Sequence, residues 1–546
     1  MDKNNPDIKS SPASSDHDVA VGTAERIDVN EDGQAQYGLY HRNISARQIH
    51  MISLGGQIGA GLFISTGKNL RDGGPAGIFL AFAVVCSCVF AVLQTVSEMT
   101  IAFPVSGNFI EYADRFVDPA LAFAAGISMW LGWTAIVAAE AVFFATIVNY
   151  WENNINDVVW YTVFLVVMLL IFSLPSRYFA WFEYGTAILK VIALFVFMIA
   201  GFAMVLGAGP KGYVHHGETW QNGAFQNGFK GFGNSVLLAV LAIGDNTFTG
   251  FLAGEAKSPR YSVGHAAFLI PIRVTVVYLV CIIFIGLLVS PDNEHLFGGS
   301  GIAQSPFVIA LNEAGIKGLP EFLNVVILFA VASIGAESIF VGSRMLRSMS
   351  RQHLIPDWVA RVDSRGRPRW AIAITCAGAI ALTYCNLSAG GITVFNWLSN
   401  IASTGYFMVW AVIAITNFRY RAAIKAQNDP LFQQVYAWKC SLWPLPPIWL
   451  LMCCSLYIGC AIYLGLYPIG SNTPSAYAFF EYVIGLILVV LSGVGYKIIC
   501  RTKMRDPRTA DLQSGRRPLN EEEILDLDRY NSQPTWRKVK SFIQLW

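Results

Sequence analysis

Four glycines stand close together in the first long apolar segment of the chain. Gly55, Gly56, Gly59 and Gly61 fall within seven residues of the run from Ile52 to Phe63. Each glycine costs a helix about 1 kcal/mol relative to alanine, and a helix in a membrane can open its backbone hydrogen bonds only where polar groups replace them. The run therefore has two interpretations. It is either a site of close helix packing through a GxxxG pair, or a break in the helix whose free backbone groups bind a small ligand.

A second apolar segment is interrupted in a similar way. The run from Leu237 to Phe251 is apolar, becomes polar around Gly244 and Asp245, and is then apolar again. Two interrupted segments, one opening each half of the helix set, are typical of transporters built from inverted repeats. The pair therefore favours the ligand-binding interpretation.

Two ionisable side chains lie inside other apolar segments, where they are costly and therefore functional hypotheses by default. Lys190 lies between Leu189 and Val191 in the fifth segment. Burial disfavours the charged form of a lysine, so Lys190 could exchange a proton; alternatively, it extends its ammonium to the membrane surface. Glu140, in the third segment, either forms a structural hydrogen bond to a neighbouring helix or takes part in binding substrate or protons.

The composition of the chain is that of an all-α integral membrane protein. Of its 546 residues, 54% are hydrophobic and 14% are charged, whereas soluble domains carry about 25% charged residues. A helix needs about 20 apolar residues to cross a membrane. We expect about twelve transmembrane helices, near residues 48–70, 77–103, 121–149, 158–174, 184–207, 233–254, 268–290, 320–344, 370–386, 392–417, 446–466 and 477–499.

Polar segments flank the expected transporter domain at residues 46–500. Residues 1–45 are polar and lack apolar periodicity, which predicts a disordered tail, and residues 501–546 form a second tail. Seven arginines lie between the eighth and ninth helices, whereas the loops at 150–157, 385–391 and 467–476 carry no Lys or Arg. By the positive-inside rule, both termini are predicted to be cytoplasmic.

Several motifs resemble those of the fungal amino acid permeases, within the amino acid–polyamine–organocation superfamily. The run from Gly55 to Phe63 is similar to the GGxIGxGLF motif of that family. Further similar stretches are Ser97–Gly107, Phe116–Leu121, Gly254–Arg260, Ser343–Leu346 with Pro356 and Arg365–Pro368, and Asp511–Arg517. The resemblance implies a five-plus-five inverted-repeat core with discontinuous helices 1 and 6, two additional helices, and proton-coupled uptake of amino acids at the plasma membrane. It also implies that Lys190 stands in the position of a proton-coupling group.

The chain departs from the family pattern in the sixth and eighth helices. Where the family has Gly-x-Glu, the glutamate position is Thr247, and Asp245 occupies a neighbouring position that is normally small. Leu241 occupies the position at which the family often carries a bulky aromatic side chain that gates the site. Phe248 could shield the site instead. In the eighth helix, Glu337 replaces the serine of the usual Asn-Ser pair. Either a hydrogen-bond partner has shifted without a change of substrate, or the site is more acidic and prefers a ligand with additional positive charge.

We expect a secondary active transporter rather than an enzyme, because the sequence shows no Ser-His-Asp framework and no clustered metal ligands. The substrate carboxylate is expected on the amides of Gly59, Ala60 and Gly61 at a half-helix N-terminus. The expected substrate-binding residues are Ile58, Gly59, Ala60, Gly61, Ile243, Gly244, Asp245, Thr247, Phe248 and Glu337, and the expected proton-coupling residues are Lys190 and Glu140.

Two rival functions stay open at this point. One is the uptake of polyamines, carnitine or other organic cations; a polyamine has no carboxylate to place on the glycine amides. The other is a nutrient sensor that binds substrate with little transport. A long folded cytoplasmic extension is the sequence feature that would indicate a sensor. The expected partners are a small-molecule substrate, protons and the lipid bilayer, and no nucleic acid, metal or cofactor is expected.

Overall fold

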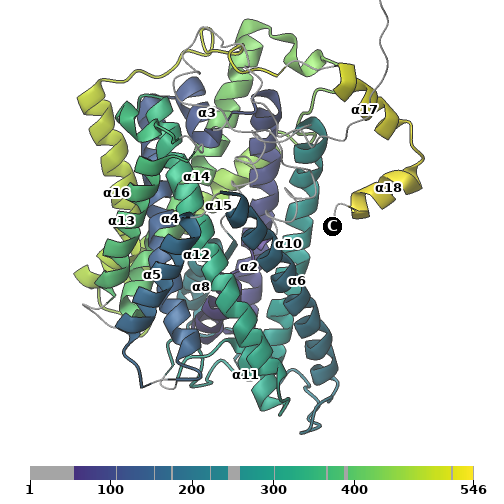
Figure 1. Ribbon diagram of the computed structural model, residues 1–546, viewed down its shortest axis with the longest axis vertical. Helices are drawn as coiled ribbons and strands as arrows, with labels where there is room; N and C mark the ends of the chain where they lie inside the picture. Colours follow the sequence, from purple (N-terminus) through teal and green to yellow (C-terminus); the bar gives the residue numbers. More distant parts are fainter. Residues whose placement is uncertain are drawn as a thin grey trace, which may run out of the picture. The chain divides into compact units, whose positions relative to one another are not determined.

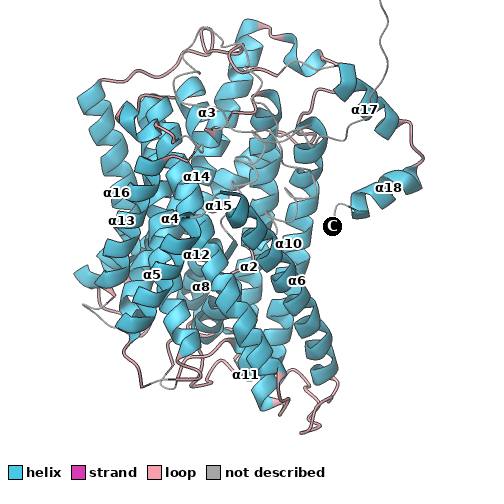
Figure 2. Cartoon of the chain, in the orientation of Figure 1, coloured by secondary structure: helices cyan, strands magenta, loops and turns pink. Residues whose placement is uncertain are grey.

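The computed structural model describes residues 55–544, except residues 106, 153, 174–175, 222, 244–258, 300–301, 364–366, 387–390 and 518–520. In this part of the chain the regular elements are helices joined by loops (Figure 2). The expected disordered tail at residues 1–45 and the polar centre of the second interrupted segment lie outside the described residues.

The helices follow one another in the order of the expected spans (Figure 1). Those that correspond to expected spans are α2 (Thr66–Ala102), α4 (Pro119–Val148), α5 (Asp157–Ser173), α6 (Ser176–Val205), α8 (Gly228–Ile243), α10 (Pro259–Leu288), α12 (Leu319–Arg351), α13 (Arg369–Cys385), α14 (Gly391–Gln427), α15 (Leu445–Leu466) and α16 (Ala476–Cys500). The shorter elements are the π-helix η2 (Gly61–Ser65), the helices α3 (Asn108–Phe116), α7 (Glu218–Gln221), α11 (Pro306–Glu313), α17 (Glu521–Asn531) and α18 (Thr535–Gln544), and the 3₁₀ helices η4 (Asp357–Ala360) and η5 (Pro430–Gln433).

The number of apolar helices agrees with the sequence. Within the described ranges, eight helical segments are long and apolar enough to cross a membrane, and three shorter apolar helices accompany them. The first long segment, Gly61–Ala102, contains parts of two expected spans, so these helices account for all twelve. The prediction of an all-helical membrane protein is confirmed.

The first two expected helices are joined by a sharp bend rather than by a loop. Gly74 interrupts the helix with φ 73° and ψ 169°, a conformation that glycine adopts without steric cost. A Cβ at Gly74 would lie 2.7 Å from the carbonyl oxygen of Ala224. Pro75 follows, and its ring is tolerated there because it begins the next helical stretch.

Two helices, α2 and α4, organise the packing of the others. α2 packs against α8, α10 and α15, whereas α4 packs against α12, α14 and α16. Small residues on α4 allow these close approaches: Gly126 faces Met349 of α12, and Gly132 faces Ala402 of α14. Both helices therefore position the elements that carry the candidate site.

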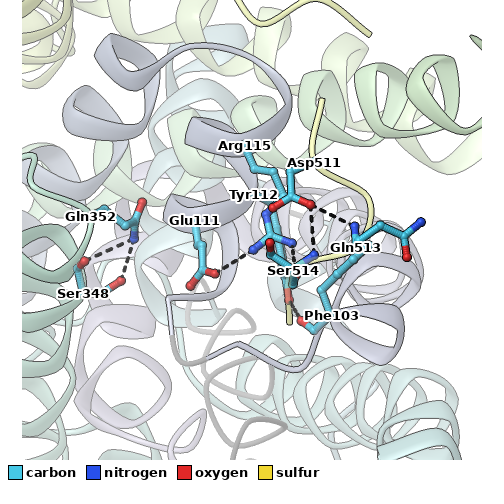
Figure 3. A network of polar contacts seen from close by, with 9 residues as sticks. All are labelled: Phe103, Glu111, Tyr112, Arg115, Ser348, Gln352, Asp511, Gln513 and Ser514. Atoms are coloured by element: carbon cyan, nitrogen blue, oxygen red, sulfur yellow. Dashed lines mark hydrogen bonds and ion pairs between the residues drawn. The ribbon is translucent and has the colours of Figure 1, made fainter. Parts of the chain in front are cut away.

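The chain beyond α16 returns across the ends of α3, α4 and α14. The Arg505 amide donates to the Val117 carbonyl at 2.8 Å. Further along, the Arg115 guanidinium of α3 donates to the Ser514 carbonyl at 2.6 Å (Figure 3). We call residues 501–517 the C-terminal strap.

Candidate functional site

The first expected span is broken at its glycine run. It continues as the π-helical turn Gly61–Ser65, a geometry that is frequent at functional sites. Short turns stabilise the break, because the Ile58 amide donates to the Gly55 carbonyl at 3.2 Å and the Leu62 amide to the Gly59 carbonyl at 3.0 Å. The first helix is therefore discontinuous, as predicted.

One tyrosine connects this break to the second interrupted segment. The hydroxyl of Tyr278, on α10, lies within hydrogen-bond distance of the Gln57 carbonyl in the break and of the Ala242 carbonyl, 2.9 Å away, near the end of α8. Tyr278 is fully buried. A hydroxyl has one hydrogen to donate, so the two carbonyls share this donor and are kept close together.

Neighbouring helices leave no room for a side chain at any of the four glycines. A Cβ would be too close to Ala187 at Gly55, to the carboxylate of Glu337 at Gly56, to Ile334 at Gly59 and to Ala242 at Gly61. Close packing and a broken helix are therefore both properties of this run, and the two interpretations of the sequence coexist.

The ammonium of Lys190 binds the broken segment directly. Its Nζ donates to the Gly55 carbonyl at 3.0 Å and to the Ser333 hydroxyl at 2.9 Å. Ser333, on α12, in turn donates to a carboxylate oxygen of Glu183 at 2.8 Å. Lys190 is only 1% exposed, so its ammonium does not extend to a surface. The network joins the first helix, α6 and α12.

Three acidic side chains lie near this lysine. Glu183, Glu337 and Glu140 are all close enough for their charges to interact with that of Lys190. Glu337 is buried against Gly56, and among the described residues its two oxygens have no hydrogen-bond partner. Because a buried, unpaired carboxylate is costly, Glu337 is a candidate to bind a proton or a cationic group of a ligand.

A cavity of about 50 Å³ lies beside the broken segment, and its walls include Gln57, Gly59, Gly61, Trp133, Glu140 and Leu241. Buried polar atoms of Gln57, Trp133 and Glu140 have no hydrogen-bond partner within the described ranges. Polar groups that converge on an otherwise apolar pocket are typical of a ligand site. The volume suffices for a few water molecules, so a bound amino acid requires the surrounding helices to separate.

The structure distributes the predicted site residues over this cavity and the network behind it. Gly59, Gly61 and Glu140 line the cavity, and Ile58 and Ala60 are buried within the same broken segment. Lys190 and Glu337 do not line the cavity; they contact the segment at Gly55 and Gly56 instead. Ile243 is the last residue of α8, and Gly244, Asp245, Thr247 and Phe248 lie outside the described residues.

Four members of this arrangement were not among the site residues expected from the sequence: Ser333, Tyr278, Gln57 and Glu183. Glu183 precedes Lys190 by seven residues, which is about two helical turns, so spacing alone could have placed both on one face of α6. Ser333 and Tyr278 carry no such signal. Over the described part of the chain, no group of three or more His, Cys, Asp or Glu side chains could hold a metal ion.

Comparison with known proteins agrees with the fold and shows the family. The family model described as "Amino acid permease" matches residues 48–507. The amino-acid permease GAP3 of Candida albicans is 33% identical over 503 residues, which cover 90% of this chain and 82% of the relative. Cationic amino acid transporter 1 of Schizosaccharomyces pombe is 30% identical over 524 residues, which cover 94% of this chain and 86% of the relative.

A solved structure supports the fold. The manganese transporter of Eremococcus coleocola matches with a TM-score of 0.50 and 14% identity, covering 83% of this chain and 93% of that chain. At this identity the similarity concerns the fold alone. The relatives are named permeases and transporters rather than enzymes, in agreement with the sequence. The chain therefore belongs to the amino acid permease family of membrane transporters.

Proposed function

We propose that this chain is a proton-coupled symporter that takes up amino acids across the plasma membrane. One contact carries the proposal: the Lys190 ammonium donates to the Gly55 carbonyl of the broken first helix at 3.0 Å. The charge of Lys190 thereby acts on the segment that we propose to bind the substrate. The family and its named members support the substrate class.

The broken first helix supplies backbone groups for the substrate. The amides of Gly59, Ala60 and Gly61 open a half-helix, and a helix N-terminus favours a carboxylate. The substrate ammonium would bind carbonyls where α8 ends at Ile243, together with Asp245. Buried polar atoms of the cavity walls offer further hydrogen bonds to a ligand.

Proton exchange at Lys190 changes its hold on the first helix. A hydrogen bond from a charged group is roughly twice as strong as one from a neutral group, so loss of the proton weakens the contact with Gly55. Ser333 and Glu183 form a buried route by which this proton can leave. The loosened segment then allows one helix bundle to rock against the other, which is the motion of alternating access.

The inward direction of transport is inferred from the proposed orientation of the chain together with the proposed proton coupling. The arginine-rich connection between α12 and α13 favours a cytoplasmic position for that end of the helices, and both termini are then cytoplasmic as well. Substrate and proton would enter together from the outside.

Uptake of cationic substrates is the second candidate, and Glu337 favours it. This buried carboxylate has no hydrogen-bond partner among the described residues, and a positive charge on the substrate would supply one. Glu337 lies against Gly56 rather than in the cavity wall, so a substrate cation would reach it only after the broken segment shifts. A cationic amino acid would then use both this carboxylate and the glycine amides, whereas a polyamine would use only the carboxylate. The similarity to a relative named cationic amino acid transporter 1 supports the same candidate.

Transport by purified protein in liposomes tests the coupling. The wild type should accumulate labelled amino acid when the outer pH is lower than the inner pH. Lys190→Met should exchange substrate but not concentrate it, because the proton carrier is gone. Lys317→Met, at an exposed lysine, is the matched control and should behave as the wild type. Uphill, pH-driven accumulation by Lys190→Met would exclude this role, and binding without transport by the wild type would favour a sensor.

A further inference from the structure

A second cavity lies between α5 and α13, two apolar helices that pack side by side (Figure 1). Its volume is about 280 Å³, far more than a single water needs. One wall is apolar and includes Leu169 and Phe172 of α5 and Ile372 of α13; the other end is formed by Arg367 and Arg369. A cavity of this kind suits a ligand with an apolar chain and a negative head.

The two arginines leave a surplus of positive charge. Both bind the same carboxylate, because the Nε atoms of Arg367 and Arg369 each lie 3.0 Å from Asp363. Arg369 is 70% exposed and has two further nitrogens on its guanidinium. One carboxylate cannot neutralise two guanidinium groups, so an anion at the mouth of the cavity would be attracted.

Exposed aromatic residues place this mouth at a membrane–water boundary. Trp358 and Trp370 meet edge to face, with ring centroids 5.3 Å apart, and both are exposed. Exposed tryptophans are enriched at the level of lipid headgroups. Leu169, in the apolar wall, and the neighbouring Leu170 are exposed, which is expected of side chains that face lipid.

We propose that the cavity between α5 and α13 binds an anionic phospholipid. The headgroup phosphate binds Arg369, whose two remaining guanidinium nitrogens can form paired hydrogen bonds with it. Arg367 already donates to Asp363 and to the Ser173 carbonyl, at 3.0 and 3.2 Å, and adds positive charge beside the phosphate. One acyl chain lies along Leu169, Phe172 and Ile372. Basic pockets between transmembrane helices on the cytoplasmic side are suited to anionic headgroups, and the arginine-rich loop predicts that this end is cytoplasmic. A free anion would make no use of the apolar wall, which is why we assign a lipid.

Lipid titration of the full-length protein in detergent tests this site. Phosphatidylserine should bind in a saturable manner, measured by native mass spectrometry and by a rise in the melting temperature. Arg369→Gln should weaken this binding about tenfold, as expected for loss of a hydrogen bond to a charged group. Ala373→Trp, which fills the cavity without changing a charge, should also weaken it. Arg361→Gln, at an exposed arginine of the same loop, should bind as the wild type.

Three results would overturn the proposal. Phosphatidylcholine could bind as tightly as phosphatidylserine, inorganic phosphate alone could raise the melting temperature as much as the lipid does, or both Arg369→Gln and Ala373→Trp could retain wild-type lipid binding. If one of these variants does not fold, the other decides, because Arg369→Gln alters the charge of the cavity and Ala373→Trp alters its space.

Discussion

At the scale of single residues, the contact between Gly56 and Glu337 connects the cavity to the Lys190 network. Gly56 lines the cavity, and a Cβ at this position would collide with the carboxylate of Glu337. A methyl group in a tightly packed site costs about 1–3 kcal/mol, and here it would also displace a carboxylate close to Lys190. A glycine that resembles a helix breaker in the sequence thus also packs against the buried carboxyl group of Glu337.

We therefore expect Gly56→Ala to reduce amino acid uptake strongly while the protein still reaches the cell surface. The control is Gly185→Ala on α6, where an added Cβ meets nothing within 4 Å, and uptake should be normal. Uptake and surface abundance are measured together in permease-deficient cells. Normal uptake by Gly56→Ala would show that the position of Glu337 does not matter for transport.

Glu337 itself allows a test of selectivity. Glu337→Gln removes the charge but keeps the shape, so it should weaken inhibition by lysine and arginine more than inhibition by leucine and glutamine. A hydrogen bond involving a charged group is worth about 1.5–3 kcal/mol, which corresponds to roughly 10- to 150-fold in affinity. Glu321→Gln, at an exposed carboxylate of α12, is the control. Equal losses for all four amino acids would mean that Glu337 serves the scaffold or the proton.

At the scale of helices, α2 and α14 are joined near their ends by a buried ion pair. Glu98 accepts hydrogen bonds from the Arg421 guanidinium at 2.8 and 2.5 Å and from the Cys440 amide at 2.9 Å. The Glu98 side chain is fully buried. Removing one partner of a buried pair leaves an uncompensated charge and costs about 3–5 kcal/mol.

Arg421→Gln should therefore lower the melting temperature of the purified protein clearly, and the double variant with Glu98→Gln should recover part of the loss. Lys425→Gln, one turn further along α14 and exposed, should change little. The melting temperature in detergent is the measurement. If Arg421→Gln and Lys425→Gln have the same melting temperature, the ion pair between Glu98 and Arg421 does not stabilise the contact between α2 and α14.

The long apolar helices were largely predictable from the sequence, because a bilayer imposes their length. The predicted bounds of α4, α5, α13, α15 and α16 lie within two residues of the observed ones. α3 was not predicted, since a helix of nine residues is too short to carry such a length signal. The bend at Gly74 falls between the expected helices at 48–70 and 77–103, where the sequence predicted a connecting segment. A Gly-Pro pair indicates an interruption of a helix but not the direction in which the chain continues.

The candidate site was less accessible from the sequence. Lys190 could be singled out because a base in an apolar run is unusual. The hydrogen-bond partners of Lys190 could not be identified from the sequence, because Gly55 and Ser333 lie 135 and 143 residues away along the chain. Such contacts depend on how α6 and α12 pack, and no local pattern reports that packing.

At the scale of the whole chain, the C-terminal strap binds segments that are far apart in sequence. Gln427 of α14 donates to the Ala510 carbonyl at 2.7 Å, and Arg115 of α3 binds the strap at Ser514 (Figure 3). Burial tends to raise the pKa of Asp511, but hydrogen bonds from Ser514 and Gln513 outweigh it and lower that pKa. A carboxylate with a lowered pKa stabilises the folded strap above about pH 4, and this contribution is lost as the pH falls through the lowered value.

A little-exposed ion pair also attaches the strap: it joins Arg516 and Asp429, whose side chains are 14% and 7% exposed. The Arg516 guanidinium donates to both carboxylate oxygens, at 3.0 and 2.8 Å, so its loss should cost about 1.5–3 kcal/mol of strap docking. We expect Arg516→Gln to be cut in the strap about tenfold faster or more by a protease without preference for arginine, because cleavage follows the population of the open form. Arg508→Gln, at an exposed arginine of the same strap, should be cut at the wild-type rate. The melting temperature of the helices should change less than the rate of cleavage, since Arg516 binds Asp429 in the loop after α14 rather than a helix. Equal cleavage of Arg516→Gln and Arg508→Gln would mean that the remaining contacts of the strap suffice to dock it.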